Sequence, residues 1–176
     1  GTQVEIFDPE TLDCLEKGRT GEIWVKGPNV FAGYWKNPGA TEPAFCKGWF
    51  RTGDLGYLSE DGYLTINGRM KELIIVGGTN VTPGEVESVV EPEAGVRECA
   101  VVGLPDRDLG EKVGVFIVPQ EGQDPVLLEK HLRERLEAEL ASYKRPRVYC
   151  FLEEIPRNTM GKIQRDRLKK LWSEES

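Results

Sequence analysis

The chain has 176 residues, of which 39% are hydrophobic and 30% are charged, and its formal net charge is −7 at pH 7. This composition is typical of a folded globular protein and argues against wholesale disorder, and the length allows one domain or two small ones. No apolar run approaches the roughly 20 residues that a membrane-spanning helix needs, so we expect no transmembrane segment. The chain begins at Gly1 without Met or a signal-peptide pattern, and we interpret it as a piece of a longer polypeptide.

Short strands separated by turns are predicted in the first third of the chain. Residues 4–6 alternate with polar neighbours, residues 21–28 form a strand that stops at Gly-Pro, and residues 63–66 follow an Asp-Gly turn. Glycine or proline recurs about every 8–12 residues, a spacing that favours a small β-barrel-like subdomain.

Helices are predicted in the remainder of the chain from their capping residues. A capping box over residues 82–85, with proline at the first helical position, predicts a helix that ends at Pro92. Asp124 and Pro125 begin a longer helix, and a last helix is expected over residues 164–172. Leucines recur at every fourth position of the longer helix and predict its buried face: Leu128, Leu132, Leu136 and Leu140.

The change of pattern near residue 71 predicts a domain boundary. Beyond it, three apolar runs of strand length alternate with the helices: residues 99–102, 113–118 and 147–152. We therefore expect an α+β fold, with a small β-barrel-like subdomain over residues 1–70 and a compact α+β domain over residues 71–176.

Cysteine spacing and charge distribution limit the metal sites and binding partners that we expect. The four cysteines form no Cys-x-x-Cys pair, which predicts free thiols in a reducing, cytoplasmic compartment and no metal site: Cys14, Cys46, Cys99 and Cys150. Residues 142–172 hold nine Lys or Arg against three acidic residues. This excess indicates either a solvated basic helix or a surface for a polyanion such as ATP or coenzyme A. The acidic remainder and the lack of interleaved aromatic residues argue against nucleic acid as a partner.

Three segments carry the candidate chemistry: Phe-Arg-Thr-Gly-Asp-Leu-Gly at 50–56, Gly-Arg-Met-Lys-Glu-Leu-Ile-Ile-Val-Gly-Gly-Thr-Asn-Val at 68–81, and Pro-Arg-Asn-Thr-Met-Gly-Lys-Ile at 156–163. Asp54 offers a carboxylate that can accept two hydrogen bonds from a ribose diol, although Asp after Gly is also a common turn residue. Arg69 offers planar, bidentate hydrogen-bond donation and a permanent positive charge, or lies in an exposed turn. Lys162 follows a glycine that leaves space beside its ammonium group.

In this order and at these separations, the three segments resemble the C-terminal part of the adenylate-forming enzymes, which include acyl-CoA synthetases, peptide-synthetase adenylation domains and luciferases. The resemblance extends from about Gly1 to Lys170. It implies that Asp54 and Arg69 bind ATP or AMP at the ribose and phosphate. It further implies that Lys162 is catalytic and bridges the acyl carboxylate and the α-phosphate of ATP.

The same resemblance implies a moving domain and a second substrate. Lys71 takes the position of the hinge about which a C-terminal lid rotates between two half-reactions. Gly77, Gly78 and Thr79 are similar to the loop that lines the pantetheine channel of coenzyme A, although a tight turn between a strand and a helix is also expected there. Two basic residues take positions near the coenzyme's nucleotide, a choice that nine neighbouring basic residues leave open: Lys144 and Arg145.

The resemblance also implies what this chain lacks. The Ser/Thr/Gly-rich phosphate loop and the Tyr-Gly-x-Thr-Glu run of the family lie upstream of the matched part. The acyl pocket, the Mg²⁺ ligands and most of the adenine site would therefore come from a missing N-terminal domain of the same polypeptide. Residues 1–70 would be the tail of that large domain, and residues 71–176 would be the mobile lid.

The expected function is that of an AMP-forming acid–thiol ligase. The whole enzyme would convert a small-molecule carboxylic acid and ATP to an acyl-adenylate and then form a thioester with coenzyme A, while the fragment alone would be inactive. Lys71 and Ile163-Gln164-Arg165 favour coenzyme A over a carrier protein. The alternatives are a peptide-synthetase or acyl-carrier-type adenylation domain, and a non-catalytic binding or regulatory module. The full-length gene would decide between them.

Overall fold

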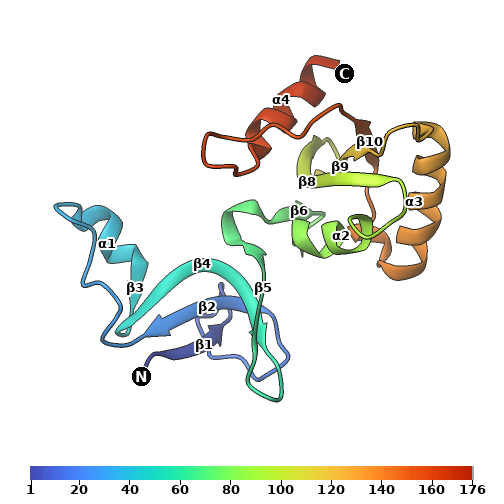
Figure 1. Ribbon diagram of the computed structural model, residues 1–176. Helices are drawn as coiled ribbons and strands as arrows, with labels where there is room; N and C mark the ends of the chain where they lie inside the picture. Colours follow the sequence, from blue (N-terminus) through green and yellow to red (C-terminus); the bar gives the residue numbers. More distant parts are fainter. Residues whose placement is uncertain (176) are drawn as a thin grey trace. The chain divides into compact units, whose positions relative to one another are not determined.

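The computed structural model describes residues 1–175 and has the α+β fold that we predicted (Figure 1). The described residues form two five-stranded sheets and four α-helices. By their internal contacts they divide into two compact units, Gly1–Lys71 and Glu72–Ser176. Unit 1 and unit 2 are described separately below.

Unit 1 is a curled antiparallel sheet with one short helix, α1 (Pro38–Ala44). Its strands follow the order β1-β2-β4-β3, and β5 pairs with β4. The strands are β1 (Gln3–Phe7), β2 (Gly21–Lys26), β3 (Phe45–Cys46), β4 (Trp49–Leu58) and β5 (Leu64–Arg69). The ring of Trp24 is 1% exposed and stacks on Phe7 with 4.0 Å between ring centroids, which centres the small core of this unit on β1 and β2.

The long strand β4 is bent by a bulge at the candidate ribose-binding segment. Glu22 of β2 faces Leu55 of β4, but Trp24 faces Arg51, so two steps along β2 correspond to four along β4. Gly53 lies inside the bulge with a φ of 72°, a conformation that glycine adopts without steric cost. Bulges bend a strand and re-aim its side chains. The alternative that Asp54 is a turn residue is therefore wrong, because the segment belongs to a strand.

Unit 2 is built on a β8–β9 hairpin with helices on both faces. Its sheet has the order β10-β9-β6-β7, with β8 pairing β9, and β10 runs parallel to β9. The strands are β6 (Ile74–Val76), β7 (Thr79–Val81), β8 (Val96–Asp106), β9 (Gly110–Pro119) and β10 (Val148–Phe151). The helices are α2 (Pro83–Val90), α3 (Pro125–Glu139) and α4 (Arg165–Glu175), with 3-10 turns at Met70–Glu72 and Ser142–Lys144.

Alternate residues of β8 and β9 divide between two apolar clusters, one on each face of the sheet. Val101 of β8 and Val115 of β9 belong to the cluster that contains the buried residues of α2 and α3. Ala100 and Phe116 belong to the other cluster, which contains Leu168 of α4. As Figure 1 shows, α2 and α3 therefore cover one face and α4 covers the opposite face.

The predicted starts of α2 and α3 are confirmed, but one of the two predicted caps is wrong. Helices α2 and α3 begin at Pro83 and Pro125. The Asp124 carboxylate accepts from the backbone N–H of Val126 at 2.8 Å, and the four predicted leucines are 0–9% exposed. Thr82, however, makes no side-chain cap hydrogen bond. Neither half of the capping box forms: the backbone N–H of Glu85 donates to the Thr82 carbonyl at 3.1 Å, and the Glu85 side chain pairs with Lys144.

None of the four cysteines forms a disulfide bond within the described residues. Cys99 is buried among apolar residues of unit 2, and this burial raises the pKa of its thiol to about 12. The thiol therefore stays protonated at neutral pH and acts as a small apolar side chain. Among the residues that the structure describes, no helix is long and apolar enough to cross a membrane.

Candidate functional site

Two of the predicted site residues meet at the end of β5. Asp54 and Arg69 face each other across the β4–β5 pair, and Arg69 Nε lies 3.1 Å from Asp54 Oδ1. The Asp54 side chain is 32% exposed and the Arg69 side chain is 48% exposed. Because an exposed ion pair adds little to stability, both groups remain able to exchange this contact for a ligand. A carboxylate beside a guanidinium offers acceptors for hydroxyl groups and donors for an anion.

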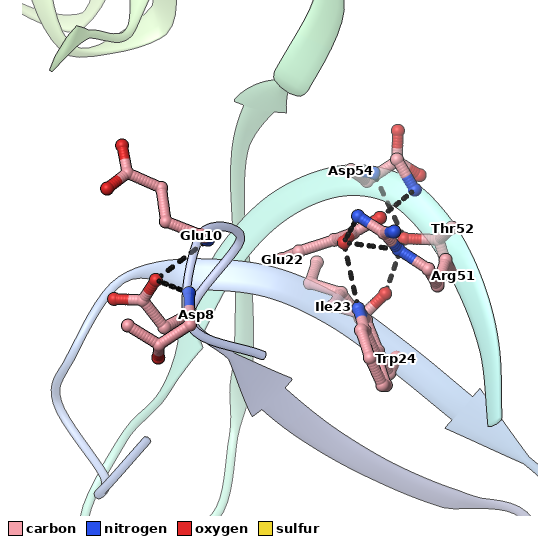
Figure 2. A network of polar contacts seen from close by, with 10 residues as sticks. Asp8, Glu10, Glu22, Ile23, Trp24, Arg51, Thr52 and Asp54 are labelled. Atoms are coloured by element: carbon pink, nitrogen blue, oxygen red, sulfur yellow. Dashed lines mark hydrogen bonds and ion pairs between the residues drawn. The ribbon is translucent and has the colours of Figure 1, made fainter. Parts of the chain in front are cut away.

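A buried carboxylate holds the backbone next to Asp54, and Figure 2 shows its contacts. Glu22 is 2% exposed, and its Oε2 accepts from Trp24 Nε1 at 2.9 Å and from Arg51 Nε and Nη2 at 3.0 and 2.8 Å. Its Oε1 accepts from the backbone N–H of Gly53 at 3.2 Å. Burying a charge is unfavourable unless it is paired and hydrogen-bonded. These contacts meet that requirement and hold the bulge in place.

Thr52 completes the support of Asp54 (Figure 2). Its hydroxyl donates to the carbonyl of Ile23 at 2.7 Å and accepts from the backbone N–H of Asp54 at 3.0 Å. The backbone on both sides of Gly53 is thus fixed by β2. Sequence reasoning missed Glu22, and the available signal was an acidic residue two positions before tryptophan in a short strand.

We predict that Glu22→Gln destabilises unit 1 by about 2 kcal/mol, somewhat less than the loss of a fully buried pair, because the Arg51 side chain can reach solvent. Urea unfolding of the chain, followed by tryptophan fluorescence, measures the change. The matched control is Glu129→Gln, which removes an exposed ion pair with Arg133 and should change the midpoint little. Equal midpoints for the two variants would contradict the prediction.

The Lys162 side chain projects from a turn that is closed by its own backbone. Arg157 and Ile163 pair across the turn, and the Asn158 side chain accepts from the backbone N–H of Lys162 at 2.9 Å. Gly161 has a φ of 79°, so it supplies a conformation that other residues rarely adopt. Within residues 1–175 the exposed Lys162 ammonium makes no hydrogen bond or ion pair. The turn therefore presents a free cation from a defined position.

The Gly77-Gly78 pair forms the tip of the β6–β7 hairpin. Their φ angles are 56° and 83°, the pattern of a two-residue hairpin turn. The backbone N–H of Gly77 donates to the carbonyl of Leu109 at 2.9 Å, whereas a Cβ at Gly78 would meet nothing within 4 Å. Thr79 begins β7 rather than a helix, so our expectation of a strand-to-helix turn was wrong. The exposed tip has open space beside Gly78.

The two basic candidates for coenzyme A already have partners in the fold. Lys144 forms an ion pair with Glu85 of α2. Although burial favours the neutral amine, the hydrogen bond and charge of Glu85 prevail and raise the pKa of Lys144. Arg145 donates to the carbonyls of Leu140 and Glu137 at 2.8 and 2.9 Å and caps the end of α3. Sequence reasoning could not foresee these contacts, which give both side chains a role in packing.

Two further expectations concern the hinge residue and metal binding. Lys71 is exposed in the 3-10 turn Met70–Glu72 and is the last residue of unit 1. In the described part of the chain, no group of three or more His, Cys, Asp or Glu side chains is arranged to hold a metal ion. These residues therefore do not fit Mg²⁺, and we assign no step to it.

Comparison with known proteins places the chain in a family. The family model of the AMP-binding enzyme C-terminal domain matches residues 85–162, and that of the AMP-binding enzyme matches residues 1–35. The chain belongs to the adenylate-forming enzymes and corresponds to their C-terminal portion. Members of this family that resemble it include CoA ligases and other ligases.

Three relatives illustrate the similarity. The indoleacetate–CoA ligase of Aromatoleum aromaticum is 42% identical over 157 residues, which are 89% of this chain and 30% of that protein. The structure of ATP-bound MatB from Rhodopseudomonas palustris matches with a TM-score of 0.90 and 42% identity, over 99% of this chain and 35% of that one. The amide bond synthetase McbA from Marinactinospora thermotolerans matches with a TM-score of 0.89 and 37% identity, over 97% and 34%. The chain thus spans about a third of the length of these relatives.

Proposed function

We propose that the chain is the C-terminal portion of an ATP-dependent acyl-CoA ligase of the AMP-forming type. The observation that carries this proposal is the pairing of Asp54 with Arg69, held by buried Glu22, together with the free Lys162 cation on its closed turn. The CoA ligases among the relatives support a carboxylic acid, ATP and coenzyme A as substrates.

The proposed chemistry has two half-reactions. In the first, a carboxylate oxygen attacks the α-phosphorus of ATP, and the bond to the β-phosphate breaks to release pyrophosphate. In the second, the thiol of coenzyme A loses its proton and attacks the acyl carbonyl, and AMP leaves. Asp54 would accept hydrogen bonds from the ribose hydroxyls and Arg69 would donate to ribose and phosphate. Lys162 would offset the charge that accumulates when the two anions meet.

In this proposal the units have separate duties. Unit 1 would be the tail of a larger nucleotide-binding domain, and unit 2 would be a lid that turns about Lys71 between the half-reactions. Lys162 would serve adenylation, and the open hairpin tip at Gly77, Gly78 and Thr79 would line the channel for pantetheine. Lys144 and Arg145 would meet the coenzyme only by giving up the contacts described above.

The test of this function uses the complete enzyme that contains the chain. ATP–pyrophosphate exchange with a panel of carboxylic acids should report adenylation, and loss of free thiol should report thioester formation with coenzyme A. The proposal would be contradicted if ATP–pyrophosphate exchange did not depend on the acid, or if no acid tested supported exchange.

A second candidate has the same first step and a different acceptor. The similarity to an amide bond synthetase, at 37% identity, favours it. An enzyme of that kind would transfer the acyl group to an amine rather than to a thiol. Offering coenzyme A and simple amines to the same acyl-adenylate separates the two functions by the product formed.

We predict that the isolated 176-residue chain folds but does not turn over substrate. In the proposed enzyme the phosphate loop and the acyl pocket belong to the upstream domain, and a few charged contacts do not offset the entropy lost on ordering a ligand. Its ATP dissociation constant should be no better than about 1 mM, near −4 kcal/mol. Calorimetric titration and a pyrophosphate-release assay measure both quantities. Turnover by the isolated chain, or micromolar ATP binding, would show that the prediction is wrong.

A further inference from the structure

Arg165 joins three elements of unit 2 at the first residue of α4. Its Nη1 lies 3.4 Å from Glu72 Oε2, and its Nη2 donates to Glu87 Oε1 of α2 at 2.8 Å. Its Nε donates to the carbonyl of Val101 in β8 at 3.3 Å. Glu87 Oε1 also accepts from the backbone N–H of Val101 at 2.9 Å. One guanidinium therefore binds α4 to two carboxylates and to the central hairpin.

These contacts are well placed to fix geometry. The side chains of Arg165, Glu72 and Glu87 are 21%, 29% and 20% exposed, so solvent screens them less than it screens the surface pairs on α3. A planar guanidinium with donors in a rigid fork can satisfy two carboxylates only in a narrow range of orientations. The cluster therefore acts as a rigid junction rather than as a loose surface contact.

The junction connects the two segments of unit 2 that the proposed function uses, the start of the unit and the Lys162 turn. Glu72 is the first residue of this unit and directly follows Lys71. Arg165 comes three residues after Lys162, and the backbone N–H of the intervening Gln164 donates to the carbonyl of Pro156 at 2.8 Å. The Lys162 turn is also attached to β8 through the ion pair of Arg157 with Glu98.

We propose that Arg165 is a positioning residue for adenylation, and that its ion pair with Glu72 carries the rotation at the hinge to the Lys162 turn. The inference rests on the proposed function, in which Lys71 is the hinge and Lys162 approaches the α-phosphate. Glu72 directly follows the proposed hinge residue, Lys71, in the chain. With the junction intact, one hinge angle gives one position of the Lys162 turn. Without it, the same hinge angle leaves that position spread over a range.

The test is Glu72→Gln in the complete enzyme, with the two half-reactions measured separately. A misplacement of about 1 Å can lower a rate about 10²-fold, and with the contacts to Glu87 and Val101 remaining we expect adenylation to fall about 10-fold. Thioester formation from supplied acyl-adenylate should stay within about twofold, because Lys162 does not serve that step. The control Glu129→Gln should change neither. Unchanged adenylation, or equal loss in both half-reactions, would overturn the inference.

A second variant tests whether Glu72 acts through Arg165 rather than on the hinge alone. Arg165→Lys keeps the charge but loses the fork, and it should lower adenylation at least as much as Glu72→Gln. Residues of one network are not additive, so the double variant should be no slower than Arg165→Lys. Losses that multiply in the double variant would overturn the inference.

Failure of the inference and failure of the proposed function give different results. If Lys162→Ala abolishes adenylation while Glu72→Gln leaves it intact, only the role of Arg165 is wrong. If Lys162→Ala itself leaves adenylation intact, the proposed function of this lysine is wrong, and the positioning role of Arg165 is overturned with it.

Discussion

Replacing Lys162 by alanine in the complete enzyme is expected to lower acyl-adenylate formation by a factor of about 10²–10³, the usual loss when one preorganised charge contact to a transition state is removed. The attack of a carboxylate on the α-phosphate brings two anions together. A cation placed beside them stabilises the transition state most, because the accumulated charge is greatest there. The structure suits this role, since the turn that presents Lys162 is closed by Asn158 and leaves the ammonium exposed.

The measurement separates the two half-reactions. ATP–pyrophosphate exchange should fall, whereas single-turnover thioester formation from supplied acyl-adenylate should be retained. Lys170→Ala is the matched control, because Lys170 is another exposed lysine of the same basic segment. Equal loss of both steps in the Lys162 variant would indicate a folding defect and contradict the assigned role.

Replacing Gly78 by leucine is expected to affect the other half-reaction. Thioester formation should be about 10²-fold slower, as for misplaced reactants, and adenylation should be nearly unchanged. In the proposed channel the tip of the β6–β7 hairpin lies against the pantetheine arm, and a leucine side chain would occupy the open space beside it. The positive φ of Gly78 adds backbone strain of about 1–2 kcal/mol for any residue with a Cβ, so a control for strain is needed.

Gly122→Leu supplies that control. Gly122 has a φ of 80°, close to the 83° of Gly78, and a Cβ at either position would meet nothing within 4 Å. Both variants should therefore lose similar stability, measured by thermal unfolding, but only Gly78→Leu should slow the transfer to coenzyme A. Unimpaired transfer in Gly78→Leu, or equal impairment in both variants, would reduce the hairpin tip to a structural turn.

Several elements were predictable from the sequence because their signals are local. Helix α3 begins at Pro125 because Asp124 accepts hydrogen bonds from the next N–H groups, and its leucines are buried because they recur at the helical period. The same cue failed at α2, where Thr82 makes no side-chain cap hydrogen bond and Glu85 pairs with Lys144. Strand β4 was missed because Gly53 and Gly56 interrupt its pattern, and β7 was missed because it has only three residues.

By itself the sequence determined the α+β class, the starts of α2 and α3 and the family to which the chain belongs, since each depends on residues that are close together or in a fixed order. Only the tertiary structure decided which charges meet. Asp54 faces Arg69, and Glu22 reaches Arg51, because of the register and bulge of three strands. Arg165 reaches Glu72 because α4 packs on the sheet. Pairings between residues so far apart in the sequence depend on packing that no local pattern encodes.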